Sequence, residues 1–198
     1  MSNNVFTTPL TDEDTTLDSL HHRLERDADT SGLLDVAYRT IDTPVGTLLL
    51  AATTVGLVRV AYDVETHAAV LAGLAESVSP RILRAPARLD TAARQIDEYF
   101  AKRRTDFDVA VDLSLTDGFR RSVIEHLRDI DYGRRESYAQ VAAAIGSPRA
   151  VRAVGSACAH NPLPVVIPCH RVVRSDGSTG QYVGGPVAKS ALLDLEAA

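Results

Sequence analysis

The first half of the chain places hydrophobic and polar residues in patterns typical of β-strands. Three segments with this pattern, VAYRTID, TLLLAAT and LVRVAYD, lie between residues 36 and 63. The turn sequence TPVG at 43–46 separates the first two, and Val55-Gly56 separates the last two. Strand-like runs joined by such turns predict a β-meander. Residues 106–113, DFDVAVDL, alternate strictly and predict one further strand.

Three other segments of the first half have helical periodicity. Residues 65–76 and 89–104 each place apolar residues on one face, and the second ends in the basic run KRR, which suits a helix C-terminus. A loop that contains prolines is expected between them. Residues 12–27 predict a short amphipathic helix outside the core, because polar residues flank its leucines. Together the strands and helices predict a small α+β unit.

The second half changes to helical periods at about Thr116. Residues 117–130 predict a first helix. In SYAQVAAAIG, Ser137 is the expected helix cap, and Gln140 stands at the reciprocal position of a capping box. A Gly-Ser-Pro turn follows, with Pro148 expected at the first position of the next helix, PRAVRAVGSACAHN. Two short helices joined by such a turn form a helix-turn-helix, which occurs in DNA-binding proteins and also in ordinary helical hairpins.

Composition narrows the class of protein. The chain has 198 residues, of which 45% are hydrophobic and 24% charged, and this excludes general disorder. No segment approaches the roughly 18 apolar residues of a membrane span, and the N-terminus lacks the features of a secretory signal. Two cysteines are too few for a disulfide scaffold or a thiolate zinc site. We expect a cytoplasmic protein with an acidic extension at 1–35, an α+β domain at 36–115 and a second domain at 116–198.

The net charge of −5 argues against a nucleic-acid partner, but it averages two unlike halves. Residues 1–117 hold 11 Lys and Arg against 19 Asp and Glu, a net charge of −8. Residues 118–198 hold 10 against 7, a net charge of +3, and nine of these cations are arginines. Arginine suits the recognition of phosphates. The asymmetry is compatible with a solvated surface and with a modest DNA-binding face.

The chemistry of the chain is concentrated in PLPVVIPCHRVV, residues 162–173. Two prolines and a run of apolar residues carry Cys169, His170 and Arg171 into what should be a buried, rigid place. A cysteine in an apolar run is often inert, but an adjacent base or cation can activate a thiol as a nucleophile. Glu196 in the terminal segment KSALLDLEAA could orient the histidine. The residues therefore suggest a nucleophile, base and orienting group.

The sequence VIPCHRVV resembles the signature of the O6-alkylguanine-DNA alkyltransferases, also called methylated-DNA–protein-cysteine methyltransferases. The resemblance continues, in the family's order, through DYGRRESYAQVAAAIG, PRAVRAVGSACAHNP, SDGSTGQYVGG and KSALLDLE. TIDTPVGTLLLAAT and IDEYFAKRRTDFDV look like the family's N-terminal domain, so the resemblance covers roughly residues 36–196. It implies an α+β (α/β) fold, with a ribonuclease H-like meander and helices followed by a mainly helical domain with the helix-turn-helix.

The resemblance also implies roles for the matching residues. Cys169 would attack the alkyl carbon, while His170, oriented by Glu196, takes the thiol proton through a water molecule. Arg152 would enter the base stack in place of the flipped nucleotide, and Tyr138 would crowd the target phosphate and donate to the base ring. The helix-turn-helix is expected in the minor groove, in contrast to the usual major-groove docking. Further DNA-facing positions are Arg149, Ala150, Ala153, Gly155 and Ser156.

Another group of matching residues would build the substrate pocket. Asn161 would brace the turn beneath it, Arg171 would have a structural or electrostatic role, and the backbone from Tyr182 to Gly185 would read the guanine edge. Val183 stands where many family members have Ser or Ala, which narrows the pocket for bulky adducts. The expected pocket and structural residues are Asn161, Pro168, Arg171, Val172, Tyr182, Val183 and Gly184.

The implied reaction moves the alkyl group of O6-alkylguanine, or less readily of O4-alkylthymine, from DNA to Cys169. The resulting thioether has no evident route of cleavage, so we expect one transfer per molecule, with no cofactor and no metal. The expected partner is double-stranded DNA containing O6-alkylguanine, without a membrane. We expect a monomer, and cooperative binding along DNA stays open.

Two other function classes compete with this interpretation. A DNA-binding module without transfer would be a lesion sensor or a helix-turn-helix regulator, and sensors of that kind lack the reactive cysteine. A Cys-His hydrolase would need an oxyanion hole and an open cleft.

Overall fold

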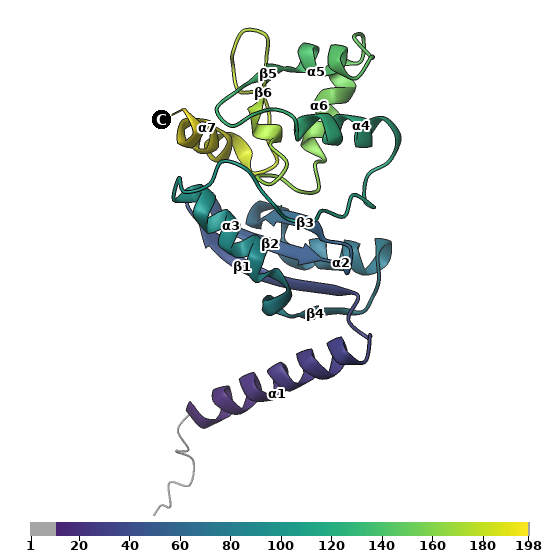
Figure 1. Ribbon diagram of the computed structural model, residues 1–198, viewed down its shortest axis with the longest axis vertical. Coiled ribbons are helices and arrows are strands. Elements are labelled where there is room, and N and C mark those ends of the chain that lie inside the picture. Colours follow the sequence, from purple (N-terminus) through teal and green to yellow (C-terminus); the bar gives the residue numbers. More distant parts are fainter. Residues whose placement is uncertain (1–10, 198) are drawn as a thin grey trace, which may run out of the picture.

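The computed structural model describes residues 11–197, apart from the side chains of residues 11–14 and 18. Figure 1 shows three parts in chain order: a projecting helix, a sheet with helices against it, and a helical unit that ends the chain. The projecting helix is α1, Thr11–Thr30, which is longer than the predicted 12–27. Its leucines are exposed, Leu17 by 63% and Leu24 by 52%, so this helix stands apart from the core as expected.

The predicted meander forms the sheet. Strand β1, Val36–Thr43, pairs antiparallel with β2, Gly46–Ala52, which pairs antiparallel with β3, Leu57–Tyr62. A short strand, β4, Ile82–Arg84, lies within the expected loop; it adds parallel to β1 and completes the order β3-β2-β1-β4. Three residues are too few to show an alternating pattern, which is why β4 was missed.

Both faces of the sheet are covered. Alternate residues of a strand point to opposite faces, and the buried residues divide accordingly. Leu48 and Leu50 pack on the side of α3, Asp90–Phe100, whereas Ala51 packs with Leu74 of α2, His67–Ser77. In Figure 1 the two helices lie on opposite sides of the sheet. Short 3-10 turns at Asp63–Glu65 and Pro86–Leu89 lead into α2 and α3.

Two predicted elements of this half differ in the structure. Helix α3 ends at Phe100 and does not continue to 104; the chain turns at Lys102, and Arg104 pairs with Glu98 at 2.9 Å. Residues 106–113 form no full strand, since only Val111 bridges Leu57 of β3. The ladder stops there because Asp112 turns the chain, accepting from the Thr53 hydroxyl at 2.6 Å and from the Ser114 backbone at 2.9 Å.

The helical unit begins with α4, Gly118–Leu127, which is followed by β5, Glu136–Ser137. The predicted helix-turn-helix consists of α5, Tyr138–Ala144, and α6, Val151–Ala159. Ser137 and Gln140 form the predicted capping box, with bonds of 3.2 and 2.7 Å. Helix α6 starts after Ala150, so Pro148 lies in the turn and not at the first helical position. The turn Ser147–Ala150 closes first, with a 2.8 Å bond between its ends.

The segment with the cysteine contains two short elements. It forms a 3-10 turn, η3, Cys169–Arg171, then β6, Val172–Val173, which pairs parallel with β5. Helix α7, Gly185–Glu196, ends the unit and lies close to η3 (Figure 1). One continuous apolar core joins the sheet to these helices, so the two parts are packed as one body. In residues 11–197, no helix has both the length and the apolarity required to cross a bilayer.

Candidate active site

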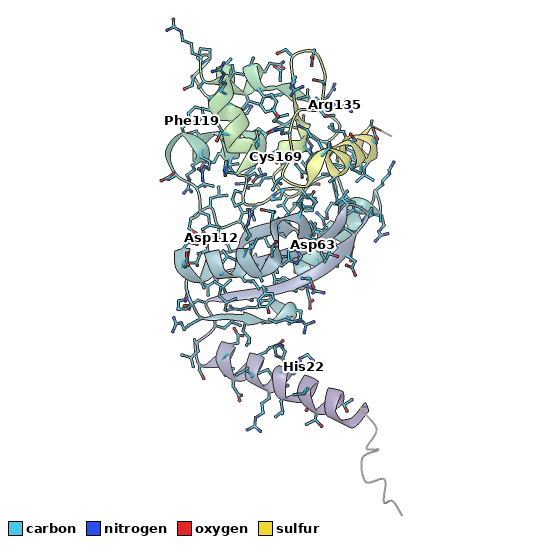
Figure 2. All side chains as sticks on the ribbon, turned by 180° about the vertical axis from the view of Figure 1, so that it is seen from behind. His22, Asp63, Asp112, Phe119, Arg135 and Cys169 are labelled. Atoms are coloured by element: carbon cyan, nitrogen blue, oxygen red, sulfur yellow. The ribbon has the colours of Figure 1, made fainter. Side chains whose placement is uncertain are left out.

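The Cys169 thiol lies inside the protein, with 2% of the residue exposed. Pro168 precedes it, and the turn η3 places Cys169 directly after the largely buried run 161–168. The Asn161 side-chain amide donates to the Cys169 sulfur at 3.1 Å and to the Ile167 carbonyl at 2.8 Å. Its oxygen accepts from the Leu163 backbone at 3.0 Å. Asn161 therefore holds both the loop and the sulfur. Figure 2 shows Cys169 within the helical unit, on its side toward the sheet.

The neighbouring His170 is fully buried and pairs with the end of α7. Its Nε2 lies 2.9 Å from Glu196 Oε1. Burial alone would raise the pKa of Glu196, but hydrogen bonds from His170, Arg171 and Tyr99 outweigh it and hold that pKa well below its ordinary value. An ionised carboxylate only accepts hydrogen bonds, so Nε2 carries the ring proton. Burial lowers the pKa of His170, which keeps the ring neutral and leaves Nδ1 as an acceptor.

The second ring nitrogen of His170 is free to accept a proton. It is buried and has no hydrogen-bond partner among the described residues. A buried polar atom left without a partner is costly unless it serves a function. Burial meanwhile raises the pKa of the Cys169 thiol to about 11, although the bond from Asn161 lowers it. The site thus combines a protonated thiol with a neutral, oriented base.

Arg171 is the third member of this buried cluster. Its guanidinium donates to both oxygens of Glu196, at 2.9 Å each, and also to the Ile130 carbonyl. It stacks over the Tyr132 ring, 5.8 Å from the centroid. A buried carboxylate needs a compensating charge, and Arg171 supplies it. Arg171 thus balances the charge of Glu196 inside the protein.

Tyr138 begins α5 beside the thiol. Burial raises the pKa of Tyr138, so its hydroxyl keeps its proton near neutral pH and can donate it. The Tyr138 hydroxyl faces Gly180: a Cβ added at Gly180 would lie 2.9 Å from the hydroxyl oxygen. Tyr182, Val183 and Gly184 lie half-buried in the segment before α7, and Val172 is fully buried. The Tyr182 ring stands perpendicular to that of His170, with centroids 6.4 Å apart. Besides burial, the nearby Cys169 thiol raises the pKa of both Tyr138 and Tyr182, so these two rings lie close to it.

The expected DNA-facing residues lie on the outer side of α6. Arg152, Ala153 and Ser156 are exposed, and Gly155 is half-exposed. Arg149 and Ala150 lie in the turn before the helix, Arg149 exposed and Ala150 half-exposed. The opposite side of α6 is buried at Val154, Ala157 and Cys158. Neither Arg149 nor Arg152 makes an ion pair with any side chain that the structure describes, so both guanidinium groups can meet a phosphate or a base.

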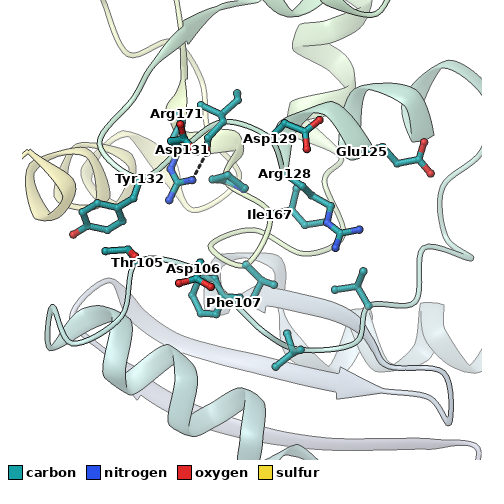
Figure 3. Close-up of a pocket in the computed structure, with 15 residues that line it drawn as sticks. Thr105, Asp106, Phe107, Glu125, Arg128, Asp129, Asp131, Tyr132, Ile167 and Arg171 are labelled. Carbon is teal, nitrogen blue, oxygen red and sulfur yellow. Dashed lines mark hydrogen bonds between the residues drawn. The ribbon is translucent and has the colours of Figure 1, made fainter.

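A cleft of about 780 Å³ lies near the site but does not open onto the thiol. It separates the segment at Asp106 and Phe107 from Ile167 and Arg171, as Figure 3 shows. Its lining residues include neither Cys169 nor Tyr138. The cleft therefore lies behind the loop that carries the cysteine and is a poor candidate for the reacting base.

Comparisons with known proteins agree with this arrangement. Residues 36–113 match the family described as 6-O-methylguanine DNA methyltransferase, ribonuclease-like domain, and residues 118–198 match its DNA binding domain. A methylated-DNA–protein-cysteine methyltransferase of Mycobacterium tuberculosis is 40% identical over 161 residues, 81% of this chain and 92% of that protein. The chain belongs to the 6-O-methylguanine DNA methyltransferase family.

Further relatives of this family show the same extent of similarity. The constitutive methylated-DNA–protein-cysteine methyltransferase of Bacillus subtilis is 36% identical over 80% of this chain and 94% of its own length. The crystal structure of Mycobacterium tuberculosis O6-methylguanine methyltransferase superposes with a TM-score of 0.72 and 38% identity, over 82% of this chain and 93% of that one. The structure of the Mycobacterium tuberculosis protein in complex with DNA gives a TM-score of 0.70 at 38% identity, over 81% of this chain and 92% of that one. The expected fold class is thus confirmed.

Two residues that contact the site were not predicted from the sequence. Lys189 of α7 is fully buried; its ammonium donates to the Val172 carbonyl at 2.7 Å and lies 5.9 Å from the centre of the Tyr138 ring. Tyr99 of α3 donates to Glu196 at 2.7 Å across the two parts of the molecule. A lysine within the apolar stretch VAKSALL was the only available signal for the first. Tyr99 looked like any other core position of an amphipathic helix.

Proposed function

We propose that this protein repairs DNA directly, by moving the alkyl group of O6-alkylguanine, and less readily of O4-alkylthymine, onto Cys169. The observation that carries the proposal is the buried Cys169 beside a His170–Glu196 pair whose second ring nitrogen is free to accept a proton. Family membership supports the same chemistry. The relatives named methylated-DNA–protein-cysteine methyltransferase align with this chain over nearly their whole length.

The thiol must lose its proton during the reaction. With a pKa of about 11, Cys169 is almost entirely protonated near neutral pH. His170 Nδ1 takes this proton, through a bridging water molecule, while Glu196 holds the ring by Nε2. The ionised Glu196 also stabilises the positive ring that forms. This arrangement generates the thiolate only at the moment of attack, within a site closed to bulk water.

The transfer is a displacement at the alkyl carbon. The Cys169 sulfur forms the new bond to carbon, the bond between carbon and O6 breaks, and its electron pair moves into the guanine ring. Tyr138 keeps its proton at neutral pH and can donate a hydrogen bond to the leaving base as charge develops. The proton from the thiol ultimately neutralises the released guanine. The product is a thioether on Cys169, which no side chain described near it can cleave, so each molecule reacts once.

The target oxygen lies inside the base stack, so the nucleotide has to be extruded at a cost of roughly a few kcal/mol. Arg152 stands on the exposed side of α6, where it can fill the vacated space. The small residues Ala150, Ala153, Gly155 and Ser156 allow the helix to approach a narrow groove closely. Residues 118–198, which match the DNA binding domain, carry a net charge of +3, and this suggests modest, salt-sensitive affinity. We propose that the protein acts as a monomer on double-stranded DNA.

Mass measurement of the intact protein tests the proposal. The protein is incubated with a duplex that contains one O6-methylguanine, and with an unmodified duplex as control. We expect the addition of a single methyl group per molecule, its loss in Cys169→Ser, and its retention in Cys158→Ser, because Cys158 lies on the buried side of α6 and burial raises the pKa of its thiol. Tight binding of the lesion without any mass change would identify a lesion sensor and contradict the proposal.

A further inference from the structure

Tyr62 is a buried residue of the N-terminal sheet to which the proposed mechanism assigns no part. It is the last residue of β3 and is 3% exposed. Its hydroxyl lies 3.1 Å from that of Tyr182, and the two rings meet edge to face with centroids 5.7 Å apart. Tyr182 in turn stands against His170. A side chain of the sheet thus reaches the expected wall of the substrate pocket.

Gly184 packs closely against the same ring. A Cβ added at Gly184 would lie 2.6 to 2.8 Å from three ring atoms of Tyr62, closer than carbon atoms that are not bonded to each other can approach. The backbone of Gly184 has φ −79°, which any residue can adopt. Glycine is therefore needed here for contact with Tyr62 and not for backbone conformation. The pocket segment from Tyr182 to Gly184 rests directly on the Tyr62 ring.

The strand that carries Tyr62 is itself held firmly. The Tyr62 backbone donates to Glu65 at 2.9 Å, and Glu65 pairs with Arg59 of the same strand. The Val60 backbone donates at 2.8 Å to the carbonyl of Pro162, in the turn beneath the thiol. Because the surrounding interior is closely packed, the ring cannot yield without disturbing β3. The end of this strand thus supports both the turn below Cys169 and the opposite pocket segment.

We propose that Tyr62 is a positioning residue that limits the size of the O6 substituent the pocket accepts. The inference rests on the proposed transfer to Cys169. A substituent larger than methyl needs room, and the segment at Val183 and Gly184 can give room only by moving toward Tyr62. The ring blocks this movement, and its hydroxyl holds Tyr182 in place. Tyr62 acts through the segment and does not touch the substrate.

Replacing the ring by a small side chain should therefore change selectivity. In Tyr62→Val the segment can recede, and the ratio of the benzyl-transfer rate to the methyl-transfer rate should rise about tenfold or more, a usual effect of added room in an apolar pocket. Tyr62→Phe keeps the ring and removes only the bond to Tyr182, so a rise of roughly threefold is expected. Gly184→Ala pushes the segment into the pocket and should lower the ratio. The double variant Tyr62→Val with Gly184→Ala should raise this ratio again above that of Gly184→Ala alone.

The experiment uses the full chain and one duplex sequence that carries either O6-methylguanine or O6-benzylguanine at the same position. Single-turnover rates over a range of DNA concentrations give the maximal rate and the half-saturating concentration for each substrate. Tyr38→Val is the matched control, since Tyr38 packs against the other face of the sheet. A purely structural loss would slow both substrates together and leave the ratio unchanged, as in the control.

The outcomes separate the two proposals. If the wild-type protein transfers no alkyl group, the proposed function fails, whatever the variants do. If the wild type transfers methyl groups and folded Tyr62→Val keeps the wild-type ratio within about twofold, the role of Tyr62 is wrong. If Tyr62→Val does not fold, Tyr62→Phe and Gly184→Ala decide: unchanged ratios in both overturn the inference, and opposite shifts support it.

Discussion

The proton path from Cys169 to His170 makes the most specific prediction, and His170→Gln tests it. A glutamine can still donate to Glu196 but cannot take a proton. In the wild type, the maximal rate of transfer should be independent of pH between the lowered pKa of His170 and the thiol pKa of about 11, because thiol and base together hold one proton throughout this range.

The size of the effect follows from the thiol. At pH 7 the pKa of about 11 leaves roughly one Cys169 in ten thousand ionised. Without its base, the variant depends on this small fraction, so transfer at pH 7 should fall by about 10²- to 10⁴-fold. The variant should then recover by about tenfold per pH unit as the thiolate fraction grows.

The assay is the single-turnover rate of methyl transfer at saturating duplex, measured from about pH 6.5 to about pH 9.5 by intact mass. His126→Gln is the matched control, since His126 of α4 pairs with Glu136 of β5 at 2.9 Å, and its profile should follow the wild type. A His170→Gln profile that stays parallel to the wild type would refute the reasoning, because it would show that His170 takes no proton. A wild-type rate that itself rises tenfold per unit would refute it equally.

Four further predictions address binding, stability and the N-terminal helix. Arg152→Ala should slow repair in duplex DNA far more than reaction with free O6-benzylguanine, and equal losses on both substrates would exclude insertion of the side chain into the stack. Glu196→Ala should lower the free energy of unfolding by about 3–5 kcal/mol, measured by urea denaturation, because it leaves Arg171 buried without its carboxylate. The lowered pKa of Glu196 stabilises the folded protein at pH values above 4.5, the ordinary pKa of this carboxyl group. This stabilisation is lost as the pH falls toward the lowered pKa, and Glu196→Gln should flatten this acid dependence of stability. Deletion of residues 1–33 should leave transfer intact, since α1 with His22 lies far from Cys169 in Figure 2, and a large loss of activity would contradict this.

Much of the fold could be predicted from local patterns. The meander follows from alternation and turn residues, and the capping box at Ser137 and Gln140 marks the start of α5 without any tertiary information. The limits of elements were less predictable. Helix α3 ends early because the chain turns at Lys102, and residues 106–113 keep only one bridge because Asp112 bonds to Thr53. The end of α3 is closed by local bonds among residues 97–104, whereas the loss of the strand at 106–113 depends on Thr53, a partner 59 residues away.

The sequence by itself determined the reactive group and its immediate neighbours: a Pro-Cys-His-Arg run in an apolar segment, next to a helix-turn-helix and in an Arg-rich half of an acidic chain. Only the tertiary structure decided the state of that group. The protonated Cys169, the tautomer of His170 and the ionised Glu196 result from burial and from hydrogen bonds between residues 26 apart. Tyr62 and Tyr182, 120 residues apart, meet only because the sheet packs against the helical unit. Local patterns report how the backbone bonds to itself, whereas pKa values and pocket walls depend on what the packed chain brings near each group and on how much water it excludes.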